Sequence, residues 1–409
     1  MNTTNKSAHQ AIIEELCYQR RNCEVCGSNS FDKAASFSEV MHINTTTRYK
    51  IDANIVVCKD CGFVFSDPCP TQESLEKYYK DSFSLFSGQD SYSIDSRMEV
   101  IKSFYSPSQS GFVEIGGNDS RRFHLKLKQL FEHVISVEVN SACDTDISTI
   151  DKIQCAENSV DMAGLYFVLE HIPNLNETIE NVSKILKIGG IMIIEVPNIY
   201  EYPYDIAGFF LVEHVNHFSP YSLAALASKY KFKLVFLSKS KCSRNFGFVA
   251  VFVKTNELIK NTHGDIEYLL AKDNIICANN LLQSRKKNIN MIVNKINEMN
   301  DKNKKVVIWC ANAYCEQIID NYINIHMMFP GTVIDSDIRK KDYFSDKPIG
   351  IQVLLPQNAK LLIQQADLII ICSKVHRHTI LEIINDNHVK NAQQRIFYVD
   401  DLFSLNSLE

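Results

Sequence analysis

The sequence has no hydrophobic run long enough to cross a lipid bilayer. Its most apolar segments, 191–196 and 368–372, have the length of strands, whereas a membrane-spanning helix needs about 20 apolar residues. Residues 1–6 are polar, and no apolar signal core follows them. We therefore expect no membrane segment and a cytoplasmic location.

Positive charge is also scarce. The 43 Lys and Arg residues are outnumbered by 48 Asp and Glu residues, so the formal net charge is -5. A protein whose main ligand is a nucleic-acid backbone needs a surplus of basic residues. The short basic runs at 302–305 and 339–341 are typical of solvated surface. We therefore expect no nucleic-acid partner.

The 13 cysteines do not form a disulfide framework, because their number is odd and most are isolated. Four of them instead lie in two matching Cys-x-x-Cys-Gly knuckles: Cys23 and Cys26, then Cys58 and Cys61. Four thiolates on two tight turns complete the tetrahedral shell of Zn²⁺ and leave no position for water. We predict a structural zinc site; the alternative is two unrelated pairs of reduced cysteines.

From residue 111 the sequence alternates between strand and helix patterns. Strands are expected at 112–115, 134–139, 160–167 and 191–196, helices at 121–131 and 176–186, and closing antiparallel strands at 234–237 and 247–253. This alternation predicts an α/β fold with a doubly wound parallel sheet. A second α/β unit is expected from 306, but its first turn, 310–314, lacks the glycines that let a backbone approach pyrophosphate. We interpret it as a degenerate Rossmann-like domain that helps to hold substrate.

The turn after the first strand carries a cofactor signal. It contains Glu114, Gly116, Gly117 and Asn118, and ligands bind at the carboxyl ends of strands in such sheets. Glu138 ends the second strand, from where an acid accepts hydrogen bonds from ribose hydroxyls. The Gly-x-Gly-x-x-Gly spacing of nicotinamide enzymes is missing.

This turn resembles the S-adenosylmethionine site of class I methyltransferases. Segments 166–173 and 186–197 resemble the signatures that follow the fourth strand and form the fifth strand in that superfamily. The resemblance implies that the five residues of the cofactor signal bind S-adenosylmethionine. The alternative is a generic α/β fold without a cofactor.

Glu213 and His214 follow the fifth strand and would lie over the reactive end of the cofactor. An imidazole accepts protons near neutral pH, and a neighbouring carboxylate can orient it or bind a ligand. His171 follows the fourth strand beside the cofactor site. The alternative is that these residues only cap or hydrogen-bond the backbone, and His217 is expected to be structural.

The order of zinc knuckles, cofactor turn, Glu-His pair and Rossmann-like domain is similar to that of zinc-containing sugar C-methyltransferases. These enzymes methylate C-3 of nucleotide-linked 4-keto-6-deoxy sugars. The resemblance implies that His214 removes the C-3 proton, and that Glu213 binds a sugar hydroxyl or steers the imidazole. It also implies that His171 helps to stabilise the developing negative charge.

The sequence departs from the family pattern on the sugar side. Leu211 stands where a tyrosine often precedes the Glu-His pair, and the aromatic loop carries Phe83 and Phe86 in place of tyrosines, although Tyr79 is close. An O- or N-methyltransferase on another glycan precursor or nucleotide-linked metabolite is therefore a second hypothesis. A scaffold protein that has kept the fold and lost the chemistry is a third. An RNA base methyltransferase is disfavoured by the charge.

The expected organisation has four parts: a zinc-binding module at 1–80, an S-adenosylmethionine-binding methyltransferase domain at 81–256, a helical connection at 257–303 and a Rossmann-like substrate-binding domain at 304–409. The expected partner is a nucleotide-linked sugar substrate, and the chain is expected to be a monomer.

Overall fold

The computed structural model describes residues 12–42, 47–82, 91–116, 121–137, 155–202, 212–241, 247–259, 265–326, 329–337, 340–341, 344, 351–373, 376–387 and 396–399. The chain divides into two compact units, Met1–Asn279 and Asn280–Glu409. Helix α6 (Asp265–Asp301) begins in the first unit and ends in the second. None of the helices in the described part of the chain combines the length and apolar character that crossing a bilayer requires.

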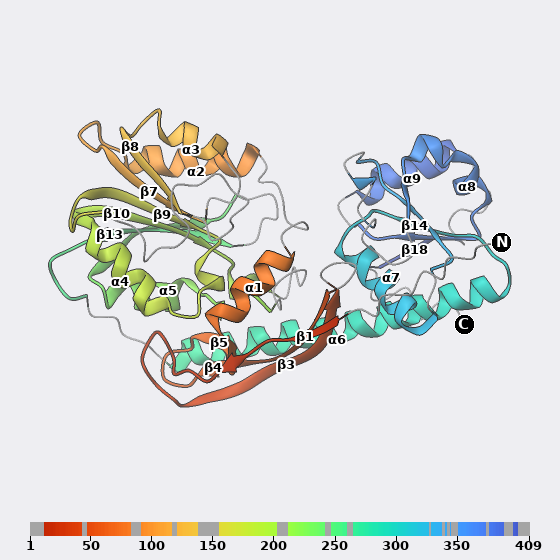
Figure 1. The fold of residues 1–409 in the computed structure, drawn as a ribbon, viewed down its shortest axis with the longest axis horizontal. Coiled ribbons are helices and arrows are strands. Elements are labelled where there is room, and N and C mark those ends of the chain that lie inside the picture. The colour runs from red at the N-terminus through yellow and green to blue at the C-terminus, as the bar shows by residue number, and fades with distance from the viewer. Residues whose placement is uncertain are drawn as a thin grey trace, which may run out of the picture. The chain divides into compact units, whose positions relative to one another are not determined.

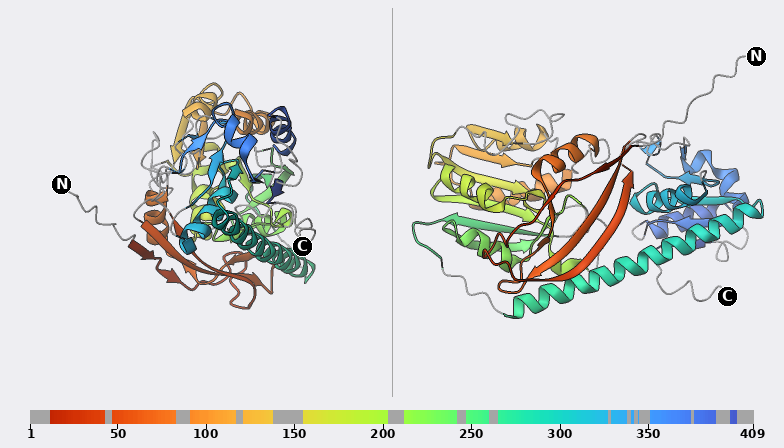
Figure 2. Two further views of the ribbon diagram at one scale, coloured as in Figure 1. Left: turned by 90° about the vertical axis from the view of Figure 1, so that its right-hand side faces the viewer. Right: turned by 60° about the horizontal axis from the view of Figure 1, so that its bottom comes forward.

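A five-stranded sheet forms the N-terminal part of the first unit. It runs in the order β1 (Ile12–Glu15), β4 (Thr47–Cys58), β5 (Val64–Ser66) and β11 (Asn216–His217), with β3 (Phe31–His42) paired to β4. Strands β3 and β4 make a long antiparallel hairpin (Figure 2). Every second residue of β4 from Tyr49 to Val57 is buried, as expected of a strand that faces a core on one side, and Val56 and Cys58 at its carboxyl end are buried as well.

Two short elements flank this sheet. Strands β2 (Tyr18–Gln19) and β6 (Cys69–Pro70) pair with each other, and helix α1 (Gln72–Ser82) follows. The backbone N–H of Ser74 donates to Oγ1 of Thr71 at 3.3 Å, so Thr71 caps α1.

The second sheet of this unit has six strands in the order β12 (Phe232–Lys239), β13 (Phe248–Lys254), β10 (Leu186–Val196), β9 (Val160–Tyr166), β7 (Gly111–Ile115) and β8 (His133–Val137). Pairs from β8 to β10 are parallel, while β13 and β12 are antiparallel. The predicted α/β fold with a doubly wound, mostly parallel sheet is confirmed.

Helices cover both faces of this sheet. Helices α2 (Ser91–Phe104) and α3 (Arg121–Leu127) lie on one face, and α4 (Leu175–Ile185) and α5 (Pro220–Ser228) lie on the other (Figure 1). All seven residues of β9 are buried, as expected for a strand covered on both sides. Helix α3 ends at Leu127 rather than at residue 131 as predicted, because Phe131 turns into the core, 1% exposed.

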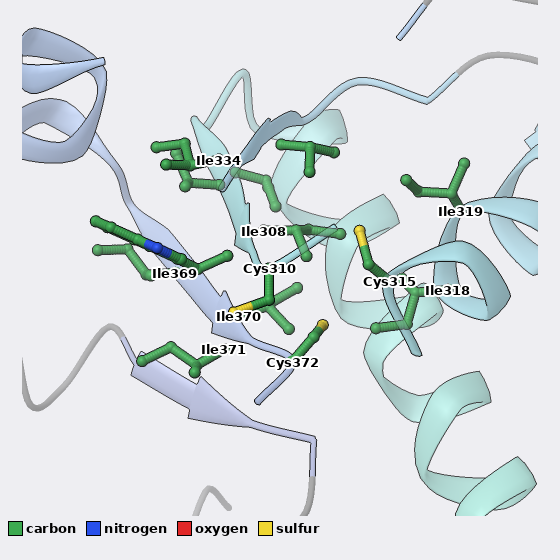
Figure 3. Close-up of a cluster of buried hydrophobic side chains, with 14 of the residues drawn as sticks. Ile308, Cys310, Cys315, Ile318, Ile319, Ile334, Ile369, Ile370, Ile371 and Cys372 are labelled. Carbon is green, nitrogen blue, oxygen red and sulfur yellow. The ribbon is translucent and has the colours of Figure 1, made fainter. Parts of the chain in front are cut away.

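The second unit is a five-stranded parallel sheet in the order β16 (Val353–Leu354), β15 (Thr332–Ile334), β14 (Val306–Trp309), β17 (Leu368–Ile371) and β18 (Ile396–Tyr398). Helix α7 (Ala313–His326) lies on one face, and α8 (Lys360–Gln365) and α9 (Arg377–Asp386) lie on the other (Figure 1). Figure 3 shows isoleucines of β14, β15 and β17 gathered with Cys315, Ile318 and Ile319 of α7.

In the second unit, the acidic residue that follows β15 hydrogen-bonds that unit's own first turn. Asp335, directly after β15, accepts hydrogen bonds from the N–H of Ala311 at 2.8 Å and from Nζ of Lys340 at 3.0 Å. Its second oxygen accepts from the N–H of Asp337 at 2.8 Å. Both oxygens of the acid that would bind a ribose in a dinucleotide fold are therefore engaged by the chain itself.

Candidate active site

The four knuckle cysteines converge. Sγ of Cys23 lies 3.5 Å from Sγ of Cys61, and Sγ of Cys26 lies 3.5 Å from Sγ of Cys58. All four sulfur atoms lie within 4.8 Å of one another. Tetrahedral zinc with Zn–S bonds of about 2.3 Å separates its sulfurs by about 3.8 Å, so the cluster fits this ion.

The glycine after each knuckle closes the turn. Gly27 and Gly62 have φ of +81° and +71°, a left-handed conformation that glycine adopts without steric cost. The N–H of Gly27 donates to the carbonyl of Cys23 at 2.7 Å, and the N–H of Gly62 donates to the carbonyl of Cys58 at 2.9 Å. The two knuckles are therefore folded alike, as their matching sequences predict.

The predicted cofactor turn begins at the carboxyl end of β7. Gly116 has φ of +73°, and a Cβ atom there would lie only 1.7 Å from Cγ2 of Val168. Glu114 is 2% exposed and accepts a hydrogen bond from Oγ of Ser136 on β8 at 3.0 Å. A glycine pressed against the segment after β9 fits a turn whose backbone must approach a nucleoside. Gly117, Asn118 and Glu138 lie outside the described residues.

The three predicted catalytic residues come together. His171 ends the 3-10 turn Leu169–His171, and its Nδ1 lies 3.2 Å from the carbonyl oxygen of Glu213. The rings of His171 and His214 meet edge to face with centroids 4.8 Å apart. Residues 213 and 214 are 5% and 8% exposed, whereas the side chain of His171 is 25% exposed. His171 is therefore the most accessible group of the three.

Two neighbours of this cluster were not predicted from the sequence. Glu170 is 2% exposed, and its Oε1 lies 3.8 Å from Nε2 of His171. Tyr78 of α1 is 1% exposed, and its hydroxyl lies near the carboxyl group of Glu213, where it offsets part of the rise in pKa that burial causes. The sequence had pointed to Tyr79, whose side chain lies outside the described residues. Helical periodicity could have indicated Tyr78, because Leu75 and Tyr78 are three residues apart on one face of α1.

Burial shifts the proton affinities of these groups. It raises the pKa of Glu213 to about 7 and the pKa of Glu170 to about 8, since a carboxylate loses its hydration there. It lowers the pKa of His171 to about 4, so this imidazole is neutral at pH 7. Within the described residues, Oε2 of Glu170 and Oε2 of Glu213 have no hydrogen-bond partner. Carboxyl groups poised near neutral pH are typical of functional sites.

The hydrogen bond of His171 fixes its tautomer. A carbonyl oxygen only accepts, so Nδ1 of His171 must carry the proton that it shares with the carbonyl of Glu213. Nε2 of the neutral ring is then an acceptor. Donation to an oxyanion from Nε2 would require the cationic ring, which the low pKa disfavours.

Two other polar residues of the predicted motifs serve the fold. Nδ1 of His217 lies 2.7 Å from the hydroxyl of Tyr202. Glu195 on β10 accepts from Nε of Arg97 at 2.7 Å and from Oγ of Ser240 at 2.5 Å. The Glu195 carboxylate thus ties α2 to the sheet.

Comparisons with known proteins gave one family match and a set of similar solved structures. Residues 86–237 match the family model of a methyltransferase domain. One similar solved structure is an S-adenosylmethionine-dependent methyltransferase from Methanosarcina mazei, 15% identical with a TM-score of 0.32, over 39% of this chain and 98% of that one. Another, from Mesorhizobium loti, is 10% identical with a TM-score of 0.32, over 39% of this chain and 100% of that one. No curated protein matches the sequence. From the family match, the chain is an enzyme that contains a methyltransferase domain at residues 86–237.

Proposed function

We propose that the chain methylates C-3 of a nucleotide-linked 4-keto-6-deoxy sugar. The observation that carries this proposal is the buried cluster of His171, Glu213 and His214, because methylation at carbon requires a base at a site sheltered from water. The segment after β9 links this cluster to the cofactor turn, since Val168 contacts Gly116 and His171 follows on the same short stretch.

The chemistry starts at the acceptor. A ketone at C-4 acidifies the C-3 proton, because the electron pair left on C-3 delocalises onto the ketone oxygen. His214 would accept that proton, while Glu213, with the Tyr78 hydroxyl nearby, would orient the imidazole or bind a sugar hydroxyl. When bound, S-adenosylmethionine supplies the methyl group on a positively charged sulfur. The carbanion formed at C-3 would be the acceptor of that methyl group.

His171 has a supporting role in this scheme. The resemblance to the family suggested that it donates to the developing oxyanion, but its tautomer makes Nε2 an acceptor. We assign it to holding the carbonyl of Glu213 and packing against the ring of His214. Fixed geometry of this kind reduces the barrier because reacting groups need not be ordered in the transition state.

The remaining site residues have binding roles in this proposal. Glu114, Gly116, Gly117, Asn118 and Glu138 would hold S-adenosylmethionine, with Glu138 accepting from the ribose hydroxyls. The four knuckle cysteines would hold a structural Zn²⁺, since four sulfurs leave it no open position. The second unit would help to bind the nucleotide-linked sugar rather than a dinucleotide, because Asp335 is engaged by its own chain. We further propose a cytoplasmic monomer that does not bind nucleic acid.

Mass spectrometry in deuterated water tests this function. The enzyme would be incubated with S-adenosylmethionine and a panel of nucleotide-linked 4-keto-6-deoxy sugars. We expect one sugar to gain a methyl group and to exchange the proton beside its ketone for deuterium. If the cofactor binds but no ketosugar is methylated or exchanged, the C-methyltransferase proposal fails, and an O- or N-methyltransferase becomes the better hypothesis.

A further inference from the structure

We propose that Arg21 is a positioning residue for the Glu213–His214 segment, and that the cysteine module thereby sets the geometry of the reaction. Arg21 precedes the first knuckle, and the candidate zinc ligands are the four cysteines alone. The proposal rests on the proposed catalytic role of Glu213 and His214.

The guanidinium of Arg21 joins three segments that are distant in sequence. Its Nη2 donates to the carbonyl of Val215, next to His214. Its Nη1 donates to Oδ1 of Asn216 at 2.9 Å and to the carbonyl of Pro173 at 3.1 Å. Its Nε donates to the carbonyl of Ser66 on β5 at 3.3 Å.

Asn216 extends this network to the turn that carries His171. The Asn216 side chain is fully buried at 0% exposure, and its Nδ2 donates to the carbonyls of Leu169 and Ile172 at 2.8 Å and 2.7 Å. The Asn216 side chain thus binds the Leu169–His171 turn through its nitrogen and accepts from Arg21 through its oxygen. The backbone next to each histidine of the cluster is therefore bound by one network.

The backbone of the Glu213–Val215 stretch depends on this network. The carbonyl of Val215 accepts from Arg21 and also from the N–H of Ser66 at 3.0 Å. The carbonyl of Glu213 accepts from His171 and, at 3.1 Å, from the N–H of Val215. Loss of the guanidinium removes the contacts that join this stretch to Pro173 and Asn216, while the Ser66 bond remains.

A lysine cannot reproduce these contacts. The planar guanidinium offers five N–H donors in a fixed fork, whereas an ammonium is a compact point charge. The ring of Phe65 lies against the guanidinium, 5.1 Å from its carbon, and stabilises its plane. We therefore expect function to decrease in the order wild type, Arg21→Lys, Arg21→Ala.

Hydrogen exchange provides the first readout, because it needs no substrate. With the full chain, we expect faster amide exchange at 212–217 in Arg21→Ala, with zinc content and affinity for S-adenosylmethionine within twofold of wild type. Arg20→Ala is the matched control, since the Arg20 side chain is 83% exposed and its ion pair is with Asp67 at 3.1 Å. Exchange at 212–217 equal in wild type and Arg21→Ala would overturn the proposal.

Turnover gives the second readout. On the ketosugar that wild type methylates, we expect kcat to fall about a hundredfold in Arg21→Ala, as for a small misplacement of catalytic groups, with KM for S-adenosylmethionine unchanged. Guanidinium below unfolding concentrations should restore part of kcat, whereas ammonium should not. A second result would also reject the positioning role of Arg21: an Arg21→Ala variant that loses kcat, is not rescued by guanidinium, and exchanges its amides at 212–217 as fast as wild type. If wild type methylates no ketosugar, the proposed function fails, and the exchange result still decides on Arg21.

Discussion

At the scale of single residues, the buried carboxyl groups make stability depend on pH. The pKa of Glu170 in the folded chain is about 8, while an unperturbed glutamate has a pKa of about 4.3. Between these values the folded state keeps a proton that the unfolded state has released. The free energy of unfolding therefore decreases as the pH rises, by at most about 1.4 kcal/mol per pH unit for one group. His171 acts at the acid end, since its low pKa reduces stability as the pH falls below about 6.5.

We predict that Glu170→Gln makes the free energy of unfolding depend less on pH above pH 5. The amide has no proton to retain, so the unfolding free energy of the variant should decrease less between pH 5.5 and 7.5 than that of wild type. Urea denaturation at several pH values measures both slopes. Equal slopes would show that Glu170 ionises in the folded chain like an exposed carboxylate.

His214→Ala should abolish methyl transfer and leave the affinity for S-adenosylmethionine nearly unchanged. The reason is that the proposed base acts on the acceptor, whereas Glu114 and Gly116 lie in the cofactor turn. Calorimetric titration and the mass-spectrometric assay measure the two effects. His133→Ala serves as control, because the His133 side chain is 71% exposed. Retained turnover, or lost cofactor binding, would contradict the role of His214.

Gly116→Ala should weaken cofactor binding at least tenfold. The new Cβ would lie 1.7 Å from Cγ2 of Val168, and the left-handed backbone costs an alanine about 1 kcal/mol more. Adding Val168→Ala should recover part of the affinity, because it removes the clashing methyl and leaves the backbone cost. Calorimetry on both single variants and the double variant checks this. A double variant as weak as Gly116→Ala would refute the clash.

The site residues differed in how well the sequence predicted them. The Cys-x-x-Cys spacing fixed the four cysteines because each knuckle is local, with partners two residues apart. The sequence also placed Glu213, His214 and His171 in one region through the order of strands. It could not indicate Glu170 or Arg21, since their significance arises from tertiary contacts. An arginine among polar residues has no periodic signal.

At the scale of elements, both sheets of the first unit pair strands that are distant in sequence. The repeated strand and helix patterns predicted β7, β9, β10 and α4 because long buried runs are strong signals. Strand β11 was not predicted, as two residues carry no periodicity. It forms because Asn216 and His217 pair with Phe65 and Val64 of β5.

The second knuckle should be sensitive to helix α6. A Cβ at Gly62 would lie 2.8 Å from the backbone carbonyl carbon of Glu267, whereas a Cβ at Gly27 would have nothing within 4 Å. Both glycines have a left-handed backbone, so each alanine variant bears a similar conformational cost. We expect Gly62→Ala to lose about 1–3 kcal/mol more stability than Gly27→Ala. Denaturant unfolding compares the two variants. Equal losses of stability would mean that α6 shifts to accommodate the new Cβ atom, and the prediction would be wrong.

At the scale of the whole molecule, the cysteine cluster should control the site without touching substrate. Cys58→Ser should lower zinc content and increase amide exchange in β11, because Cys58 ends the strand that pairs with β5. Cys277→Ser is the control, since this cysteine is exposed and lies outside the cluster. Metal analysis and hydrogen exchange measure both effects. A Cys58→Ser protein with full zinc and unchanged exchange would refute the four-cysteine site.

The pairing of β5 with β11 also dictates an order of assembly. Arg21 and Asn216 are separated by 195 residues, so the knuckles leave the ribosome long before their partner strand exists. Until then, the outer edge of β5 carries unpaired N–H and carbonyl groups, which can pair with other chains. Pairing of β11 with β5 is therefore a late step of folding that completes the active site, and a nascent chain stalled before residue 216 would be both inactive and prone to aggregate.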